Sequence, residues 1–498
     1  MEKLQGENRS FWKMTEHGVS YPKLAQDIEV DTAVIGGGIS GILTAYFLAK
    51  RGKSVALLEA RELVGGTTGG TTAKLSSQHE LIYDKMIELG GVELAKQYYE
   101  ANQTGLRLIE ELITEHAIHC GFEEMDSYVF SQHGTNTQNL EKEAAAYEMI
   151  GIEGGMTDSV PLDFNVASAL VMKDQAQIHP VKFLHGVLRE IDQMGGRIYQ
   201  HTKYMGTERN GEQLTLQTDT QFTVSCRQVV LATLFPAEDP HSFYSNTMKP
   251  VTSHLTAFAS PQTFVKGVYI SDDAPKRTFR GAQDGDRHVL IVGGETHPTG
   301  DAKSTIERYE AIRQFAKEEF GLTDMIGYWS EHELTTPDMR PYIGPIEEGD
   351  DQMYVMTGYN KWGMTAAAAG AQLIADLITG KPNRFEELFN PQRSLPEKNK
   401  EDSGQSNDAF KSLLQRAERL EKGQADQFKQ NGKPIGIYKD LNSNVHYLDL
   451  HCTHLGCGVR WNDGDQTWDC PCHGSIFDGT GEVLAGPAKQ PLKKVNPY

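Results

Sequence analysis

The fold of most of this chain is decided by residues 28–59, IEVDTAVIGGGISGILTAYFLAKRGKSVALLE. The apolar run at 28–35 predicts a buried strand, the run up to about residue 50 a helix, and residues 54–58 a second strand. Gly36, Gly38 and Gly41 follow the first strand in the spacing G-x-G-x-x-G. In such a unit the first glycine makes the turn, the second lets backbone approach a pyrophosphate, and the third lets helix pack on strand. The stretch therefore predicts a Rossmann-type α/β domain that binds a dinucleotide.

Three further features indicate which groups hold that dinucleotide. The helix N-terminus, at Ile39 and Ser40, carries a partial positive charge that suits phosphate. Glu59 lies 18 residues after Gly41, at the end of the second strand, where an acid accepts hydrogen bonds from ribose hydroxyls. A second flexible, donor-rich loop, GGTTGGTTAK at 65–74, follows closely and favours FAD over NAD.

Two later segments complete the expected FAD site. Residues 229–233, VVLAT, predict a buried strand that ends in small residues. Residues 354–365, YVMTGYNKWGMT, lead into an alanine-rich helix to about 378, whose small side chains permit close packing against sheet and cofactor. Besides those already named, the candidate FAD-contacting residues are Thr67, Thr68, Thr71, Thr72, Ala232, Thr233, Gly358, Gly363, Met364 and Thr365.

Two short boxes near the C-terminus, CTHLGC at 452–457 and CPCHGS at 470–475, have metal-ligand spacing: C-x-H, then 15 residues, then C-x-x-H. Two thiolates and two imidazoles can hold the irons of a [2Fe–2S] cluster, and imidazole in place of thiolate raises the reduction potential. A structural zinc site is the alternative, because zinc accepts the same ligand types. A zinc site, however, has no need of the extra Cys457 and Cys472. The expected cluster ligands are Cys452, His454, Cys470 and His473.

These boxes resemble those of the Rieske proteins of respiratory cytochrome bc complexes, and the resemblance covers residues 409–498. It implies that Cys457 and Cys472 form a disulfide that ties two loops over the cluster. It also implies a hydrogen bond from Ser475 to a bridging sulfide. The tyrosine that usually bonds a ligand sulfur is replaced here by Phe477. A third loop that covers the cluster would contain Gly486 and Pro487.

The preceding part, roughly residues 10–390, resembles the D-amino-acid-oxidase-type flavoproteins, such as glycine, sarcosine and γ-glutamylputrescine oxidases. Besides the opening strand–helix–strand stretch, the matching segments are QIHPVKFLHGVL at 177–188, VVLAT at 229–233, TPDMRPYIG at 336–344 and TGYNKWGMT at 357–365. The resemblance implies a FAD-binding domain with an antiparallel α+β substrate lobe. It further implies that the helix N-terminus at Gly363, Met364 and Thr365 supplies backbone donors near the flavin pyrimidine ring.

Two departures from that family bear on the substrate and the loop. Its amino-acid oxidases often carry an arginine shortly before the T-P-D stretch, to hold the substrate carboxylate. Here residues 329–338 read WSEHELTTPD, with Glu331 and Glu333 where a base is expected. A cationic amine is then favoured over an α-amino acid, unless both acids simply face water. Arg340, the nearest remaining cation, is either a carboxylate clamp or a structural residue. The loop at 65–72 also differs from the usual G-x-S-x-R-x-x-G.

The expected layout is an N-terminal extension, an oxidoreductase part, a linker and a small all-β Rieske domain. Polar residues 390–408 are typical of a linker. A short helix at about 408–421 and a hairpin with its turn at 440–444 are expected after it. The extension covers residues 1–27, the oxidoreductase part 28–389, the linker 390–408 and the Rieske domain 409–498. Within the oxidoreductase part, the FAD-binding segments are expected at about 28–90, 161–236 and 328–389. The substrate lobe is expected at about 91–160 and 237–327.

Composition limits the partners. The chain has 498 residues and a formal net charge of −20, which argues against nucleic acid and anionic membrane surfaces as ligands. No apolar run approaches the roughly 18 residues of a membrane span, and residues 1–14 lack the apolar core of a signal peptide. A cytoplasmic protein is expected, in which the leftover Cys120 and Cys226 are reduced, partly buried thiols. The oligomeric state is open.

The sequence thus predicts a FAD-dependent oxidoreductase that acts on an amine or amino-acid-like C–N bond. Electrons would pass one at a time between flavin and the fused cluster, in either direction, with an external protein or quinone as the other partner. A second hypothesis is an electron-transfer or redox-sensing protein, or a reductase component, with no amine substrate. A hydroxylating system is disfavoured because no ligand set for a mononuclear iron is recognisable. No catalytic base is identified.

Overall fold

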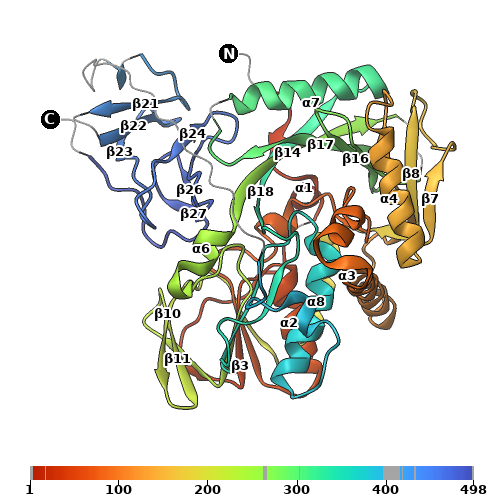
Figure 1. The fold of residues 1–498 in the computed structure, drawn as a ribbon. Coiled ribbons are helices and arrows are strands. Elements are labelled where there is room, and N and C mark those ends of the chain that lie inside the picture. The colour runs from red at the N-terminus through yellow and green to blue at the C-terminus, as the bar shows by residue number, and fades with distance from the viewer. Residues whose placement is uncertain are drawn as a thin grey trace.

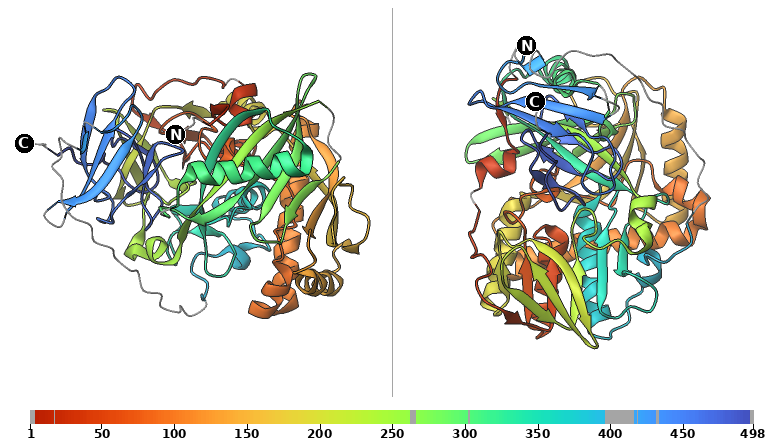
Figure 2. Two further views of the ribbon diagram at one scale, coloured as in Figure 1. Left: turned by 90° about the horizontal axis from the view of Figure 1, so that it is seen from above. Right: turned by 90° about the vertical axis from the view of Figure 1, so that its left-hand side faces the viewer.

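A computed structural model describes residues 4–16, 18–261, 266–301, 303–395, 416–417, 419–430 and 433–495. The chain forms two sheet-and-helix layers side by side, with a smaller β domain at one end (Figures 1 and 2). In the described residues no helix is both long and apolar enough to cross a membrane. The two leftover thiols, Cys120 and Cys226, are buried, and burial raises their pKa to about 11 and about 12.

A six-stranded sheet forms the centre of the FAD-binding part, and every neighbouring pair except β19–β20 is parallel. Its strand order is β19 (Tyr342–Pro345), β20 (Met353–Thr357), β13 (Gln228–Leu231), β3 (Thr32–Ile35), β4 (Val55–Leu58) and β9 (Arg197–Tyr199). The helices packed beside it are α2 (Ile39–Lys50), α5 (Pro180–Gln193) and α8 (Gly363–Ile378). Their apolar residues join a buried core with those of the strands.

The strand expected at 28–35 is two strands. Asp31 turns the chain between them, since its carboxylate accepts hydrogen bonds from the backbone N–H and hydroxyl of Ser54, both at 2.8 Å. The first piece joins a separate four-stranded sheet, in which it pairs in parallel with β12. That sheet has the order β10 (Tyr204–Asn210), β11 (Gln213–Thr218), β12 (Thr223–Cys226) and β2 (Ile28–Glu29).

A ten-stranded sheet forms the substrate lobe. Three of its strands come from ranges that the sequence analysis assigns to the FAD-binding part. These strands are β5 (Lys74–Leu75), which lies within 28–90, and β8 (Ser168–Gln177), which lies within 161–236. The third is β18 (Met325–Thr335), which lies at the edge of 328–389. The order is β1 (Glu7–Asn8), β18 (Met325–Thr335), β14 (Lys249–Ser260), β17 (Arg287–Pro298), β16 (Arg277–Asp284), β15 (Val268–Ser271), β6 (Glu123–Ser131), β8 (Ser168–Gln177) and β5 (Lys74–Leu75), with β7 (Gly154–Thr157) on β8. The remaining helices of this part are α1 (Phe11–Thr15), α3 (Tyr83–Glu115), α4 (Thr137–Ile150), α6 (Phe243–Thr247), α7 (Thr305–Phe320) and α9 (Glu386–Phe389).

The C-terminal domain consists of two small antiparallel sheets around the buried Trp468. The expected hairpin is present, with Asp440 N–H donating to the Asn444 carbonyl across its turn at 2.9 Å. Most of the helix expected at 408–421, and most of the linker, lies outside the described residues. The sheets are β21 (Ala425–Gln430), β22 (Lys433–Lys439) and β23 (Val445–Asp449), and β24 (Arg460–Asn462), β25 (Thr467–Asp469), β26 (Ile476–Asp478) and β27 (Val483–Ala485). In Figure 1 this domain, in blue, lies beside one end of α7.

Candidate functional site

The glycine turn after β3 is required by close backbone contacts. Gly36 has φ +112°, and a Cβ there would lie 2.6 Å from the carbonyl oxygen of Ala232. A Cβ on Gly41 would lie 1.9 Å from the carbonyl oxygen of Gly36. The turn therefore brings β3, β13 and the start of α2 together without side chains between them. Gly38 is the N-cap of α2, so the helix N-terminus carries no side-chain cap of its own.

Glu59 closes the same turn from the end of β4. Its Oε2 accepts a hydrogen bond from Gly37 N–H at 2.7 Å, and its Oε1 accepts one from Arg61 N–H at 2.8 Å. Because each carboxylate oxygen has a second lone pair, both can still accept from a ligand. The carboxylate is thereby fixed at the edge of the cavity.

A cavity of about 680 Å³ opens beside this turn. Gly41, Thr72, Gly358 and Thr365 do not line it. Gly41 lets α2 pack closely against the glycine turn. The Thr365 hydroxyl donates to Asn102 Oδ1 at 2.8 Å, away from the cavity. The expected FAD-site residues that do line it are Gly36, Gly38, Ile39, Ser40, Glu59, Thr67, Thr68, Thr71, Ala232, Thr233, Gly363 and Met364. The glycine turn, two helix N-termini and an acid thus face one cavity, as a bound FAD requires.

Two residues of the N-terminal extension, which sequence reasoning missed, hold the second glycine loop. The Lys13 ammonium donates to the Gly65 carbonyl, and the Trp12 indole N–H donates to the Thr71 carbonyl at 2.6 Å. A Cβ on Gly69 would lie 2.6 Å from Lys13 Cε. The loop departs from the family pattern because these side chains cross it. No local signal marks them, since their partners lie 52 and 59 residues away.

Glu331 and Glu333 of β18 both line the cavity. Glu331 is buried against Gly70, where a Cβ would lie 1.3 Å from its Oε1, and burial raises its pKa well above the usual range despite the nearby Lys13. Glu333 is different, because its Oε2 is shielded from solvent without a hydrogen-bond partner among the described residues. Burial raises the pKa of Glu333 to about 7; Lys361 opposes that shift and Glu80 adds to it. Glu333 is thus the one of the two acids with an unpartnered, buried oxygen at the cavity wall.

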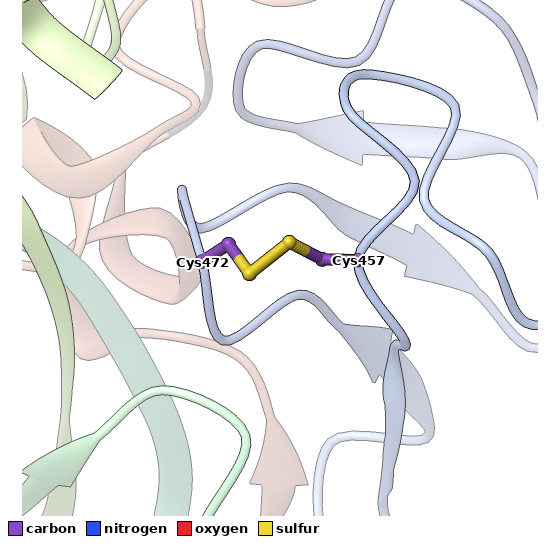
Figure 3. The surroundings of a disulfide bond; sticks show 2 residues. All are labelled: Cys457 and Cys472. Carbon is purple, nitrogen blue, oxygen red and sulfur yellow. A yellow bond between two sulfur atoms is a disulfide. The ribbon is translucent and has the colours of Figure 1, made fainter. Parts of the chain in front are cut away.

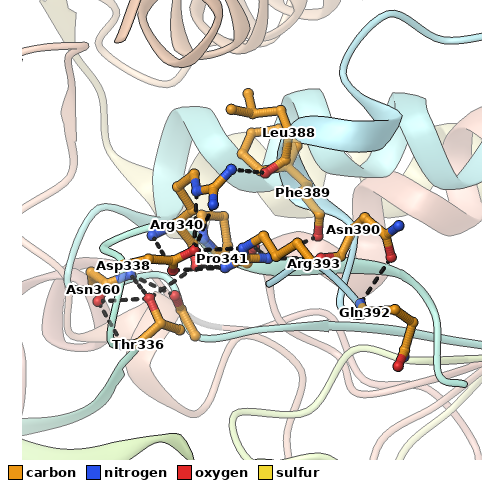
Figure 4. A network of polar contacts seen from close by, with 11 residues as sticks. Thr336, Asp338, Arg340, Pro341, Asn360, Leu388, Phe389, Asn390, Gln392 and Arg393 are labelled. Atoms are coloured by element: carbon orange, nitrogen blue, oxygen red, sulfur yellow. Dashed lines mark hydrogen bonds and ion pairs between the residues drawn. The ribbon is translucent and has the colours of Figure 1, made fainter. Parts of the chain in front are cut away.

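Arg340 lies outside the cavity lining and is bound within the protein (Figure 4). Its guanidinium contacts the Asp338 carboxylate at 2.8 Å and the Leu388 carbonyl at 3.3 Å. Arg393 binds the same Asp338 at 2.6 Å. This geometry fits the structural role and not a carboxylate clamp.

The four expected cluster ligands converge at one end of the C-terminal domain. The thiols of Cys452 and Cys470 contact each other, and this contact lowers the pKa of Cys452 to about 6. The rings of His454 and His473 have centroids 4.9 Å apart. His454 Nδ1 is buried without a hydrogen-bond partner in the described part of the chain. Paired thiols and an orphaned ring nitrogen fit a [2Fe–2S] cluster with two cysteine and two histidine ligands.

Cys457 and Cys472 form a disulfide between the two ligand loops, with Cα atoms 6.4 Å apart (Figure 3). Ser475 is fully buried, and its Oγ accepts a hydrogen bond from Ala488 N–H at 3.2 Å, which ties the loop after Pro487 to the ligand box. Phe477 is also fully buried and packs in the same core as the two ligand cysteines. Phe477 thus belongs to the apolar core that supports the ligand loops.

The imidazole end of this domain faces the FAD-binding part. Phe235, four residues after the end of β13, has its ring centroid 5.8 Å from that of His454 and 6.1 Å from that of His473. Phe235 also lines the large cavity, as do residues 485–489 of the C-terminal domain, which include Gly486 and Pro487. One wall of the FAD cavity is thus made by the domain that carries the cluster ligands.

The comparisons with known proteins agree with both sites. Residues 31–377 match the family model described as FAD dependent oxidoreductase, and residues 411–496 match the Rieske [2Fe-2S] domain. A relative from Bacillus subtilis (strain 168), described as a Rieske 2Fe-2S iron-sulfur protein, YhfW, is 37% identical over 98% of this chain and 97% of its own length. Gamma-glutamylputrescine oxidoreductase of Escherichia coli (strain K12) is 24% identical over 76% of this chain and 92% of its own.

The fold of the first part also has solved counterparts. Glycine oxidase from Geobacillus kaustophilus superimposes with a TM-score of 0.63 at 18% identity, covering 74% of this chain and all (100%) of the oxidase. The expected cofactors, FAD and a Rieske 2Fe-2S cluster, are confirmed by the two family matches. The chain belongs to the FAD dependent oxidoreductase family and carries a fused C-terminal Rieske [2Fe-2S] domain.

Proposed function

We propose that this protein oxidises an amine or amino-acid-like C–N bond at FAD and exchanges the electrons one at a time with its own Rieske cluster. The observation that carries the relay is the contact of both ligand imidazoles with Phe235, a residue of the FAD cavity wall. FAD supplies two-electron chemistry at a C–H bond, and the cluster carries single electrons. An external protein or quinone takes or supplies the electrons, and the relay can run in either direction.

The substrate side of the proposal rests on Glu333. It occupies the segment where amino-acid oxidases of this family often have an arginine, and its Oε2 has no partner among the described residues. A buried carboxylate holds an ammonium group by a charge-assisted hydrogen bond and repels a substrate carboxylate. The name of the E. coli relative, gamma-glutamylputrescine oxidoreductase, also favours an amine as the substrate. We therefore infer a cationic amine rather than a plain α-amino acid.

The rest of the cavity would orient that amine and exclude water. Trp329, Leu334 and Met364 give it an apolar wall. The N-terminus of α8 at Gly363 presents backbone N–H groups without a side-chain cap, which favours negative charge beside it.

An anaerobic screen of amines tests the proposal. A cationic amine should bleach the flavin absorbance, and the EPR signal of the reduced Rieske cluster should follow. Amino acids that carry an α-carboxylate should react poorly. If dithionite reduces the flavin but no amine does, the redox-sensing or reductase alternative replaces this proposal. Bleaching without any cluster signal would reject the relay and leave amine oxidation standing.

A further inference from the structure

The turn between β24 and β25 of the Rieske domain meets the N-terminus of α7 in the flavin part. Asp463 Oδ1 accepts from Thr305 N–H and from Thr305 Oγ1, both at 2.8 Å, and Asp463 Oδ2 accepts from Ser304 Oγ at 2.7 Å. Asn462 Oδ1 also accepts from Thr305 Oγ1, at 2.7 Å. A helix N-terminus needs acceptors for its free N–H groups and favours negative charge. Here a second domain supplies both.

The fit of this turn leaves no room for a side chain. Gly464 is buried, and a Cβ on it would lie 2.4 Å from Thr305 Oγ1. The next residue, Asp465, accepts a hydrogen bond from the buried Tyr309 hydroxyl at 2.9 Å. We call residues Asn462–Asp465 the docking turn. Its contacts are directional and polar, so they specify one orientation of the domain.

The domain has further contacts outside this turn. The Lys489 ammonium donates to the Met205 carbonyl at 3.3 Å, and the Lys489 carbonyl accepts from Lys203 Nζ at 2.9 Å. A Cβ on Gly474 would lie 3.0 Å from Pro250, and one on Gly300 would lie 3.1 Å from Pro471. Arg460 donates to the Gly300 carbonyl at 3.0 Å. Pro471 and Gly474 lie on either side of His473 in the sequence, and the His473 ring meets Phe235. The docking turn is thus an attachment point separate from those at Lys489 and at the imidazole end.

We propose that the docking turn is a positioning element that holds the imidazole edge of the Rieske domain against Phe235. The contacts at Phe235 and Lys489 are few, and a flexible linker by itself gives an effective concentration only in roughly the millimolar range. The docking turn adds specific hydrogen bonds through residues that are not cluster ligands, and so fixes the orientation of the domain. This inference rests on the proposed electron relay.

Charge reversal in the full-length holoprotein tests the inference. Asp463→Lys places a cation at the positive end of α7 and should undock the domain, whereas Asp463→Asn keeps one acceptor oxygen and should retain part of the docking. Asp440→Lys is the matched control, because Asp440 also binds a turn of the Rieske domain but all its hydrogen bonds stay within that domain. Gly464→Val, which adds bulk without charge, is the second undocking variant.

Two measurements are made on every variant with full FAD and iron. Photoreduction of the flavin, which needs no substrate, gives the rate of electron transfer to the cluster. Hydrogen exchange gives the protection of the backbone N–H groups at 305–309. We expect Asp463→Lys and Gly464→Val to slow the transfer at least about tenfold, since the loss of charged hydrogen bonds changes equilibria by that order. They should also lower the protection at 305–309 and leave the EPR spectrum of the cluster unchanged.

The outcomes separate the two proposals. Unchanged protection and unchanged transfer in both undocking variants would overturn the positioning role. Lower protection with unchanged transfer would also overturn it, because docking would then not govern the rate. A wild-type protein that shows no transfer at all would reject the relay itself. If Asp440→Lys behaves like Asp463→Lys, the effect comes from the charge of the domain, and the docking turn has no special role.

Discussion

Glu333 combines an unpartnered carboxylate oxygen with a raised pKa, and both follow from its place in the cavity wall. Burial disfavours the charged form, so the side chain is neutral below about pH 7 and charged above it. The groups that face it are Lys361, which opposes this shift, and Glu80, which adds to it. Binding of a cationic amine should therefore tighten as pH rises through about 7.

Glu333→Gln should weaken amine binding by roughly 1.5–3 kcal/mol, the value of a hydrogen bond to a charged group, and should remove this pH dependence. The dissociation constant is measured from the flavin absorbance change at several pH values. Glu331→Gln is the matched comparison, since Glu331 contacts Gly70 and lies near Lys13, and should alter the FAD loop more than the amine. A Glu333→Gln protein with wild-type affinity at every pH would contradict the assignment.

Phe477 stands where the Rieske proteins that this domain resembles usually have a tyrosine. It is buried beside the ligand cysteines and pairs with Trp468 across β25 and β26. Phe477→Tyr should add a hydroxyl donor to a ligand sulfur and so stabilise the more negative, reduced state. About 1 kcal/mol of such stabilisation raises the one-electron potential by roughly 40 mV. Protein-film voltammetry measures the shift, with Phe477→Leu as the variant that adds no donor; a lower or unchanged potential in Phe477→Tyr would count against the geometry.

At the scale of elements, the segments that were predicted well are those whose signal is local. The glycine turn, α2 and β4 lie within 32 consecutive residues, and both ligand boxes are six residues long. Spacing alone fixes such sites. Residues 28–35 predict one strand because they contain no glycine or proline, and the contact of Asp31 with Ser54 shows that the chain turns there.

The disulfide between the ligand loops should protect the cluster without being needed to form it. It spans a sequence separation of 15 residues, for which loop-closure entropy corresponds to about 3 kcal/mol. The double variant Cys457→Ser, Cys472→Ser should keep the Rieske EPR signal and lose it faster on warming or with a chelator. Single variants are poorer tests, because each leaves a free thiol near the ligands. Equal cluster lifetimes in the double variant and the wild type would show that the link has no such role.

For the whole molecule, the features that sequence reasoning missed all join distant segments. Lys13 and Trp12 reach the second glycine loop, Phe235 meets two histidines more than 200 residues later, and Asp463 caps a helix that begins 158 residues earlier. None has a pattern around it, because its partner is set by tertiary packing. The composition of the glycine loop does carry a signal, because Gly69 and Gly70 indicate a close approach of other groups. Those groups are Lys13 at Gly69 and Glu331 at Gly70.

The intact protein should contain both cofactors in fixed amounts. We expect about one FAD and two iron atoms per chain, and no zinc, because the cavity fits one dinucleotide and the four ligands fit one [2Fe–2S] cluster. Metal analysis together with the flavin absorbance of the purified protein measures this ratio. One zinc and no iron would contradict the Rieske assignment. Iron without flavin would be consistent with the cluster and would contradict the FAD site.

Residues 485–489, which complete the wall of the FAD cavity, come more than 100 residues after the start of α8. Domains generally fold in the order in which the ribosome releases them. The glycine turn, β13 and the start of α8 are therefore all available while this wall is still missing. A half-site that faces the FAD cavity can therefore form during synthesis, before the segment that covers it is made. The order of these segments along the chain thus places most of the FAD cavity wall before the iron–sulfur domain that closes it.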